Sequence, residues 1–177
     1  MFKTPSHKAL PRQGDPRKFA QHGVTLEGFI PVSELGRIVD ATESSEGEVS
    51  VNLEFALSEE RKKVVTGTAS AELSLVCQRC LEPVVVPVES NISLAVVWDE
   101  EEAEKLPKHL DPWITGEGVA DLYEMIEEEL LLSLPAVAYH QETCLDSKLY
   151  SSGKPVEVKK EKNPFQVLEQ LKSSPKS

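Results

Sequence analysis

The chain has 177 residues, of which 40% are hydrophobic and 28% charged, and its formal net charge is −11. This composition is typical of a folded globular protein and excludes a wholly disordered chain. Because it has no long apolar run and its N-terminal segment is polar, we expect neither a transmembrane helix nor a secretory signal. We therefore expect a cytoplasmic protein, whose three cysteines stay reduced instead of forming a disulfide framework.

The charge is unevenly distributed along the chain. Residues 1–22 hold five Lys or Arg against one Asp, and residues 154–177 hold six Lys against three Glu. Residues 23–153 hold eight basic and twenty-six acidic side chains. Because such an acidic centre repels phosphate, it disfavours a broad RNA-binding face, and a basic protein is the expected type of partner. The two basic ends could contact RNA or be solvated and disordered.

The first elements expected in chain order are an arm, a strand and a short helix. Residues 1–22 are rich in Pro, Gly and charge, which predicts an extended basic arm. Residues 23–32 have strand character, and Ser33 is a candidate N-cap for a following helix. The inner side of that helix is expected to carry Leu35, Ile38 and Val39.

Three strand-like segments follow, at residues 49–57, 64–76 and 84–98. Short connections between them predict an antiparallel meander, either a twisted sheet or a partial barrel. Gly67 is expected to mark a bulge or bend, and Pro87 to lie at an edge or bulge, because proline cannot donate to a ladder. The first segment alternates, with one face expected to consist of Val49, Val51, Leu53, Phe55 and Leu57.

The clearest helix is predicted over residues 119–135, with Pro135 as its stop. A short acidic helix or loop at 99–106 and a turn with a brief strand at 111–118 precede it. The expected fold class is thus α+β, a meander packed by one long amphipathic helix, with flexible termini. The apolar stripe of that helix comprises Leu122, Met125, Ile126, Leu130 and Leu134, with Glu124, Glu127 and Glu128 on its other side.

Four segments follow from this pattern. The arm at 1–22 precedes a single α+β domain at 23–144, and the polar residues 145–162 are a linker. Residues 163–172, NPFQVLEQLK, predict a short C-terminal helix that docks on its own domain or on a partner. Its apolar face consists of Phe165, Leu168 and Leu171.

All three cysteines fall in two short clusters. Cys77 and Cys80 form a CxxC at the expected hairpin tip, and His140 and Cys144 follow the predicted helix. Because zinc prefers four soft or borderline ligands, this Cys3His set is a candidate structural zinc site that would join the hairpin to the end of the helix.

Other interpretations of these residues remain open. Cys77 could be a small apolar strand residue, Cys80 a turn residue and His140 a solvated loop histidine. A redox role is disfavoured, because a thioredoxin-type CxxC opens a helix, not a hairpin. Arg79, between the two cysteines, is expected to be exposed at the tip, where it could contact phosphate or an acidic patch.

Patterns that carry catalysis are missing from the sequence. It has no Gly-rich phosphate loop, no GxSxG and no HExxH, and its acidic runs at 99–104 and 127–129 are expected to be solvated. The chain is therefore predicted not to be an enzyme and to take no small-molecule substrate.

Three motifs in order resemble the YceD family of bacteria and plastids. They are CQRCLEPV, DLYEMIEEELLLSLPAVAYHQETC and NPFQVLEQLK, and the resemblance runs from roughly residue 23 to 172. His140 stands where many relatives carry a cysteine before a longer cysteine-rich tail.

The resemblance implies a non-enzymatic cytoplasmic factor in synthesis, processing or stability of large-subunit ribosomal RNA. The partner would be the RNA precursor or its proteins, with no membrane involved. The preferred mechanism is a bridge to basic ribosomal or maturation proteins through the acidic surface, with Phe165, Leu168 and Leu171 as a docking element. The alternative is a zinc-pinned RNA-binding module, whose salt-dependent affinity would be lost on Arg79→Ala with removal of the tails. A nuclease that uses the acidic runs ranks last.

Overall fold

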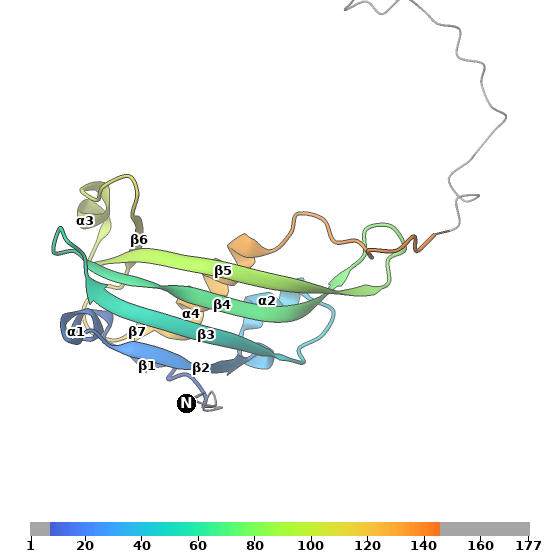
Figure 1. Cartoon of the computed structure of the whole chain (residues 1–177), viewed down its shortest axis with the longest axis horizontal. Helices are drawn as coiled ribbons and strands as arrows, with labels where there is room; N and C mark the ends of the chain where they lie inside the picture. The colour runs from blue at the N-terminus through green and yellow to red at the C-terminus, as the bar shows by residue number, and fades with distance from the viewer. Residues whose placement is uncertain (1–7, 146–177) are drawn as a thin grey trace, which may run out of the picture. The chain divides into compact units, whose positions relative to one another are not determined.

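A computed structural model describes residues 8–145 of the chain. A five-stranded sheet in the order β2-β3-β4-β5-β6 forms its centre, and a small second sheet pairs β1 with β7 (Figure 1). No helix within residues 8–145 is long and apolar enough to cross a membrane. The predicted linker at 145–162, apart from its first residue, and the helix at 163–172 lie outside the described residues. The strands are β1 (Gln13–Gly14), β2 (Thr25–Pro31), β3 (Glu48–Leu57), β4 (Lys63–Val76), β5 (Pro83–Val97), β6 (Asp111–Ile114) and β7 (Ala120–Asp121).

The meander predicted from the sequence is confirmed for β2 to β5, where every neighbouring pair is antiparallel. The sheet is open and twisted, with no closed barrel in the described chain. β6 departs from the meander, because it runs parallel to residues 94–97 of β5. The connection of residues 98–110, which contains helix α3 (Glu100–Glu104), carries the chain back before β6 starts, and such a return produces a parallel pair.

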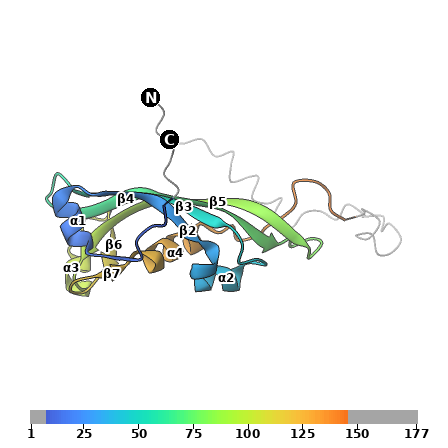
Figure 2. The same cartoon turned by 90° about the horizontal axis from the view of Figure 1, so that it is seen from below.

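The sheet has one covered face and one open face. Figure 2 shows α1, α2 and α4 on the same side of it, so the described fold has two layers. Buried and exposed residues alternate along β3, as the period-2 pattern predicted. Leu57, the last residue of β3, is the exception, with 51% of its surface exposed. The largest fully buried side chains come from the covered face and from the helix α4 that covers it, among them Phe55, Ile30, Leu53 and Leu73 of the sheet and Ile126 and Leu130 of the helix.

Helix α1 (Pro16–His22) corrects the prediction of an extended arm over residues 1–22, which is wrong for its second half. The Asp15 carboxylate accepts from the backbone N–H of Arg17 and Lys18, and Pro16 occupies the first turn. Phe19 packs edge-on against Phe55, with ring centroids 5.3 Å apart. Burial of this apolar side against the sheet outweighs the polar composition that suggested an arm.

The short helix predicted after β2 is present as a 3-10 turn (Val32–Glu34) and α2 (Gly36–Ala41). Ser33 is not the N-cap, because it lies inside the 3-10 turn. The N-cap positions are held by Pro31 and Leu35, whose side chains form no capping hydrogen bond. The cap comes from far along the chain instead. Glu127 Oε1 accepts from Arg37 N at 2.7 Å and from Ile38 N at 3.2 Å.

Helix α4 (Leu122–Ser133) stands where residues 119–135 were predicted to be helical, but it has 12 residues. Ala120 and Asp121, just before the helix, form β7. After the helix, Leu134 has an extended backbone at φ −63 and ψ 137, the conformation that a residue before proline favours. Glu127, expected on the polar side, is buried with 8% of its surface exposed. The prediction of one long amphipathic helix is therefore not confirmed.

Glu127→Gln is expected to destabilise the fold by about 1–3 kcal/mol. An amide oxygen can still accept from the α2 backbone, but a charge-assisted bond is roughly twice as strong as a neutral one, and the buried amide gains donors that need partners. Chemical denaturation would measure this loss. Glu128→Gln is the matched control, because its exposed ion pair with Arg37 at 3.3 Å should contribute less than about 1 kcal/mol. Equal losses in the two variants would contradict the capping role of Glu127.

Gly67 and Pro87 are the two strand residues at which the sequence predicted an irregularity of the sheet. The register of β4 runs without interruption through Gly67, which pairs with Leu53 on one side and Ile92 on the other. This register excludes a bulge at Gly67, and the alternative, a bend there, stays a prediction. Pro87 pairs only with Glu72 of β4, because β6 covers a later part of β5 among the described strands, so its predicted edge position is confirmed.

Candidate metal centre

The first half of the site is the connection between β4 and β5, residues 77–82. It is closed by Cys77 N donating to Glu82 O and Leu81 N donating to Cys77 O, both at 2.9 Å. Leu81 has a positive φ of 62, which reverses the chain within this short distance. The hairpin tip predicted from the sequence is thus confirmed, and it places Cys77 and Cys80 three residues apart on a fixed turn.

The second half is the segment that follows α4. Gln78 N donates to Ala138 O at 2.9 Å, so residues of the hairpin tip hold this segment by its backbone. Ala138, 6% exposed, packs into a small apolar cluster with Leu75 and Val84. Figure 1 shows the segment running beside the tip of the β4–β5 hairpin. These contacts bring His140 and Cys144 to Cys77 and Cys80 although about sixty residues separate the two pairs.

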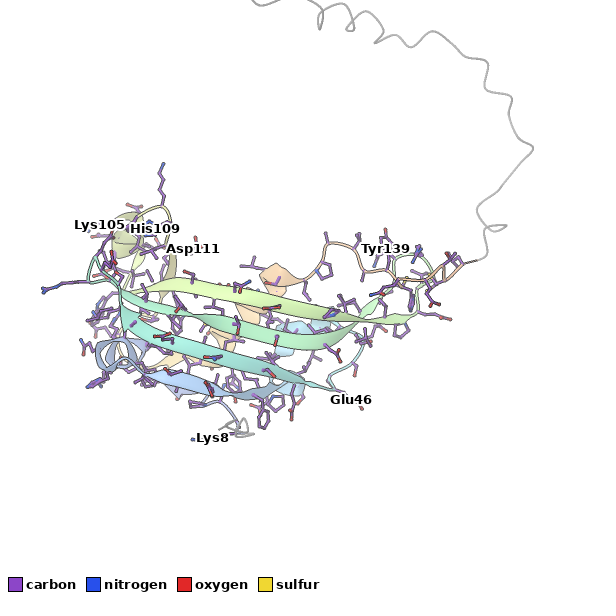
Figure 3. All side chains as sticks on the ribbon, viewed as in Figure 1. Lys8, Glu46, Lys105, His109, Asp111 and Tyr139 are labelled. Atoms are coloured by element: carbon purple, nitrogen blue, oxygen red, sulfur yellow. The ribbon has the colours of Figure 1, made fainter. Side chains whose placement is uncertain are left out.

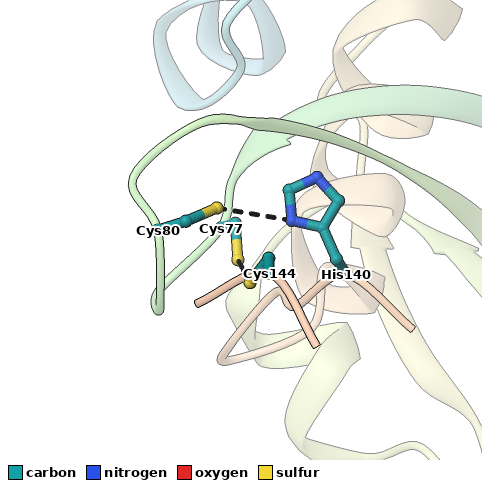
Figure 4. A group of neighbouring side chains, drawn as sticks. All are labelled: Cys77, Cys80, His140 and Cys144. Carbon is teal, nitrogen blue, oxygen red and sulfur yellow. Dashed lines mark hydrogen bonds between the residues drawn. The ribbon is translucent and has the colours of Figure 1, made fainter. Parts of the chain in front are cut away.

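The four predicted ligands converge in the structure (Figure 4). Cys77 Sγ lies 3.8 Å from Cys144 Sγ, and Cys80 Sγ lies 3.5 Å from His140 Nδ1. One ligand atom from each of the four residues lies within 4.8 Å of the others, so together they could bind a metal ion. Cys77 is buried and the other three are half-buried.

The hydrogen bonds around Cys77 favour a thiolate. Burial by itself would raise the pKa of this thiol, but backbone N–H groups of Cys80, Arg79 and His140 act in the opposite direction and bring the pKa to about 5. Burial and the neighbouring sulfurs of Cys80 and Cys77 raise the pKa of Cys144. One sulfur is therefore prepared as an anion, the form in which cysteine binds a metal.

The tautomer of His140 follows from its contacts. Its Nε2 lies 3.1 Å from the carbonyl oxygen of Pro83, which can only accept, so Nε2 carries the proton. Nδ1 then presents its lone pair toward Cys80. Metal-binding histidines characteristically donate their second ring nitrogen to a carbonyl or carboxylate in this way. The role of Pro83 was not foreseeable from the sequence, because any residue supplies a carbonyl.

Arg79 is half-buried, whereas the sequence analysis expected it to be exposed. Its Nη2 donates to the backbone carbonyls of His140 and Glu142, and its guanidinium lies 5.2 Å from the centre of the Tyr139 ring. Figure 3 shows Tyr139 at this end of the molecule. Arg79 thus links the two halves of the site, because the carbonyls of the second segment turn toward it. Its predicted contact with RNA or a partner stays a prediction.

The acidic runs do not assemble a second centre. Within residues 8–145 the Cys/His group is the one cluster with metal-binding geometry. Neighbouring carboxylates of α4 diverge, since Glu127 caps α2, Glu128 pairs with Arg37, and Glu129 lies near Ser90 of β5. Burial first, and then the charge of Asp111, raise the pKa of Glu129. Phe165, Leu168 and Leu171, the predicted docking face, lie outside the described residues.

Fold and site together define a small α+β protein in which the hairpin and the segment after α4 bring together three Cys and one His that could bind a metal ion. The family described as "Large ribosomal RNA subunit accumulation protein YceD" matches residues 65–172. A protein of that name from Haemophilus influenzae is 30% identical over 168 residues, covering 92% of this chain and 96% of the relative. The chain belongs to the YceD family. No solved structure matches it.

Proposed function

We propose that this protein is a non-enzymatic factor in the synthesis, processing or stability of large-subunit ribosomal RNA, acting in the cytoplasm. The observation that carries the proposal is its membership of a family described by large ribosomal RNA subunit accumulation. The sequence shows no catalytic motif of the common kinds, and the four converging ligands would fill a tetrahedral shell without an open position for a substrate.

The proposed mechanism is protein bridging. Residues 23–153 carry more than three times as many acidic as basic side chains, a surface that attracts basic proteins and repels RNA phosphate. The bridge would hold a basic ribosomal or maturation protein, and the predicted helix at 163–172 would add a second contact. Its association with ribosomal RNA would then be indirect.

We further propose that the metal is a structural zinc ion. With Zn–S bonds of about 2.3 Å and Zn–N bonds of about 2.0–2.1 Å, an ideal tetrahedron separates two sulfurs by about 3.8 Å and a sulfur from a nitrogen by about 3.6 Å. The separations of 3.8 Å and 3.5 Å in this structure fit those edges. The ion would staple the β4–β5 hairpin to the segment after α4.

Affinity purification of the tagged protein from growing cells tests the bridging function. We expect immature large-subunit RNA together with large-subunit proteins to be enriched, and deletion of residues 163–177 to reduce that recruitment severalfold while the melting temperature is kept. Intact recruitment after the deletion would contradict the docking role of the helix. Enrichment of a transcription or RNA-decay protein instead would contradict a role on the assembling particle.

Direct RNA binding is the second candidate. A zinc-pinned hairpin tip with Arg79 on it would be the contact, and its affinity for RNA would fall steeply with salt. Protein bridging ranks first, because the Arg79 guanidinium already donates to the carbonyls of His140 and Glu142 and the surrounding domain is acidic.

A further inference from the structure

The face of the five-stranded sheet opposite α1, α2 and α4 carries no helix within the described chain (Figure 2). Its strands are in continuous register, so the side chains that share this face can be assigned position by position. Between its charged positions the open face is mostly neutral and polar, with Ser50, Asn52, Thr66, Thr68, Ser70, Asn91 and Ser93. The same register also places Phe29, Val85 and Pro87 on this face.

The charges on the open face all have one sign. Five glutamates point outward from it, and every one of them is exposed: Glu27, Glu48, Glu54, Glu72 and Glu89. Within β2 to β5 the one Lys or Arg is Lys63, which pairs with Leu57 at the end of the sheet and has the other parity. Lys8 flanks the outer edge of β2, where its carbonyl accepts from Phe29 N at 3.0 Å, and Figure 3 places Lys105 near α3 at the other end of the sheet.

A groove of about 630 Å³ lies in this face, where β3, β4 and β5 run side by side. Glu72 pairs with Pro87, and Ser70 with Glu89, so Glu72 and Glu89 are diagonal neighbours, roughly 7–8 Å apart at their Cα atoms. Two like charges at this separation repel each other weakly in water, and neither forms an ion pair within residues 8–145. The groove is lined by residues that include Glu48, Ser50, Ser70, Glu72, Pro87 and Glu89.

A second like-charged pair lies farther along the same face. Glu27 pairs with Asn52, and Thr25 with Glu54, so Glu27 and Glu54 are also diagonal neighbours. Along β3, Glu54 is about 20 Å from Glu48 at the groove, since a strand rises about 3.4 Å per residue. An extended peptide of about six residues would reach from the groove to this pair.

We propose that the open face of the sheet binds a lysine- and arginine-rich extended segment of a partner protein. This proposal rests on the proposed bridging function and names the surface that performs it. The cations would pair with the two groups of glutamates, and the Ser, Thr and Asn side chains between them would hydrogen-bond to the peptide. A cation between Glu72 and Glu89 would also offset their weak mutual repulsion.

A partner is the occupant that the charges favour over the chain's own basic ends. With both ends counted the chain still carries −11, so intramolecular pairing leaves a large acidic excess. Residues 154–177 also carry three Glu beside their six Lys, which weakens their attraction for the open face.

The test is binding of a fluorescent synthetic peptide of alternating lysine and threonine to the full chain, followed by anisotropy at low and physiological salt. The double variant Glu72→Gln, Glu89→Gln should lower the affinity about tenfold, the upper range for two exposed ion pairs. The matched control is Glu100→Gln with Glu104→Gln on α3, which removes the same charge elsewhere and should change the affinity less than about twofold. Carbodiimide crosslinks from the peptide should concentrate on Glu72 and Glu89.

Three results would overturn the proposal. Equal loss of affinity in both double variants would show that the peptide is attracted by the overall negative charge of the protein and not by the open face of the sheet. Crosslinks concentrated on α3 would place the peptide elsewhere. The third result comes from the full chain with the six lysines of residues 154–177 changed to glutamine. If its affinity for the peptide is about tenfold higher than that of the parent, the chain's own C-terminal segment is the occupant.

The peptide-binding experiment tests the open face, and the affinity purification tests the proposed function, so the two can fail independently. If the peptide fails to bind while the purification still recovers large-subunit proteins, bridging stands and uses another surface. If the peptide binds as expected while no large-subunit component is recovered, the face is a basic-segment site and the proposed place in ribosomal RNA accumulation is wrong.

Discussion

Replacing His140 with alanine should remove bound zinc from the purified protein and lower its melting temperature by about 10 °C. Structural zinc contributes roughly 10–16 kcal/mol of binding free energy in small domains, so loss of one of four ligands is expected to cost about 3 kcal/mol or more. For a chain of this size 1 kcal/mol corresponds to about 2–4 °C. Elemental analysis of the protein and calorimetry of its unfolding measure the two effects.

Two further samples make that result specific to the metal. His140→Cys keeps a zinc ligand at the same position and should retain the metal and most of the melting temperature. A chelator should bring the parent down to the melting temperature of His140→Ala and leave that variant unchanged. His109→Ala, at the opposite end of the molecule in Figure 3, should change neither quantity. If alanine at each of Cys77, Cys80, His140 and Cys144 left the melting temperature unchanged, the structural metal would be refuted.

Gly67→Ala should destabilise the protein by about 3 kcal/mol or more, although alanine is ordinarily the better residue in a strand. A Cβ at Gly67 would lie 2.0 Å from the carbonyl oxygen of Asn52 and 3.0 Å from the Cα of Leu53. Both neighbours are backbone atoms of β3, so they can yield only if the two strands separate. Since β4 and β5 carry both the metal centre and the acidic groove, the change should also weaken metal retention and peptide binding.

Gly36→Ala is the control for the loss of a glycine. Nothing lies within 4 Å of the added Cβ at this position in α2. Because alanine favours a helix and restricts the unfolded chain, this variant should be more stable than the parent by up to about 1 kcal/mol. Urea denaturation of both variants measures the difference, and a Gly67→Ala protein as stable as the parent would show that β3 can move away from β4 at little cost.

The sequence was sufficient for the strands that carry the site. Apolar residues at every second position determine which face of a strand is buried, and that pattern is local, so β3 was predictable within a residue. The CxxC between two apolar runs likewise placed Cys77 and Cys80 on a hairpin tip. The types of the four candidate ligands, three sulfurs and one imidazole, already indicated a metal such as zinc.

Helix α1 was predictable from signals that composition obscured. Asp15 before Pro16, with Gly23 at φ 62 after the last turn, is a standard start and stop for a helix. Proline and charge in the same segment suggested an arm. The helix is stabilised by a tertiary contact, because Phe19 can pack against Phe55 only when the sheet is formed.

Three other features depend on parts of the chain that no local pattern connects. Glu127 belongs to the polar side of α4 by periodicity, and it is buried because the free N–H groups of α2 lie beside it. β6 pairs parallel to β5 because the chain between them returns along the sheet. The open face becomes a single acidic surface only when four strands align in register.

The sequence by itself determined the strands, the hairpin tip, the ligand types and the family, because each is written in residues close together or in a motif that stays in order. That His140 and Cys144 meet Cys77 and Cys80 was a candidate from the sequence, and the tertiary structure decided it through the hydrogen bond from Gln78 to Ala138 and the contact of His140 with Pro83. Those contacts join segments about sixty residues apart, and their free energy comes from packing that exists only in the folded chain.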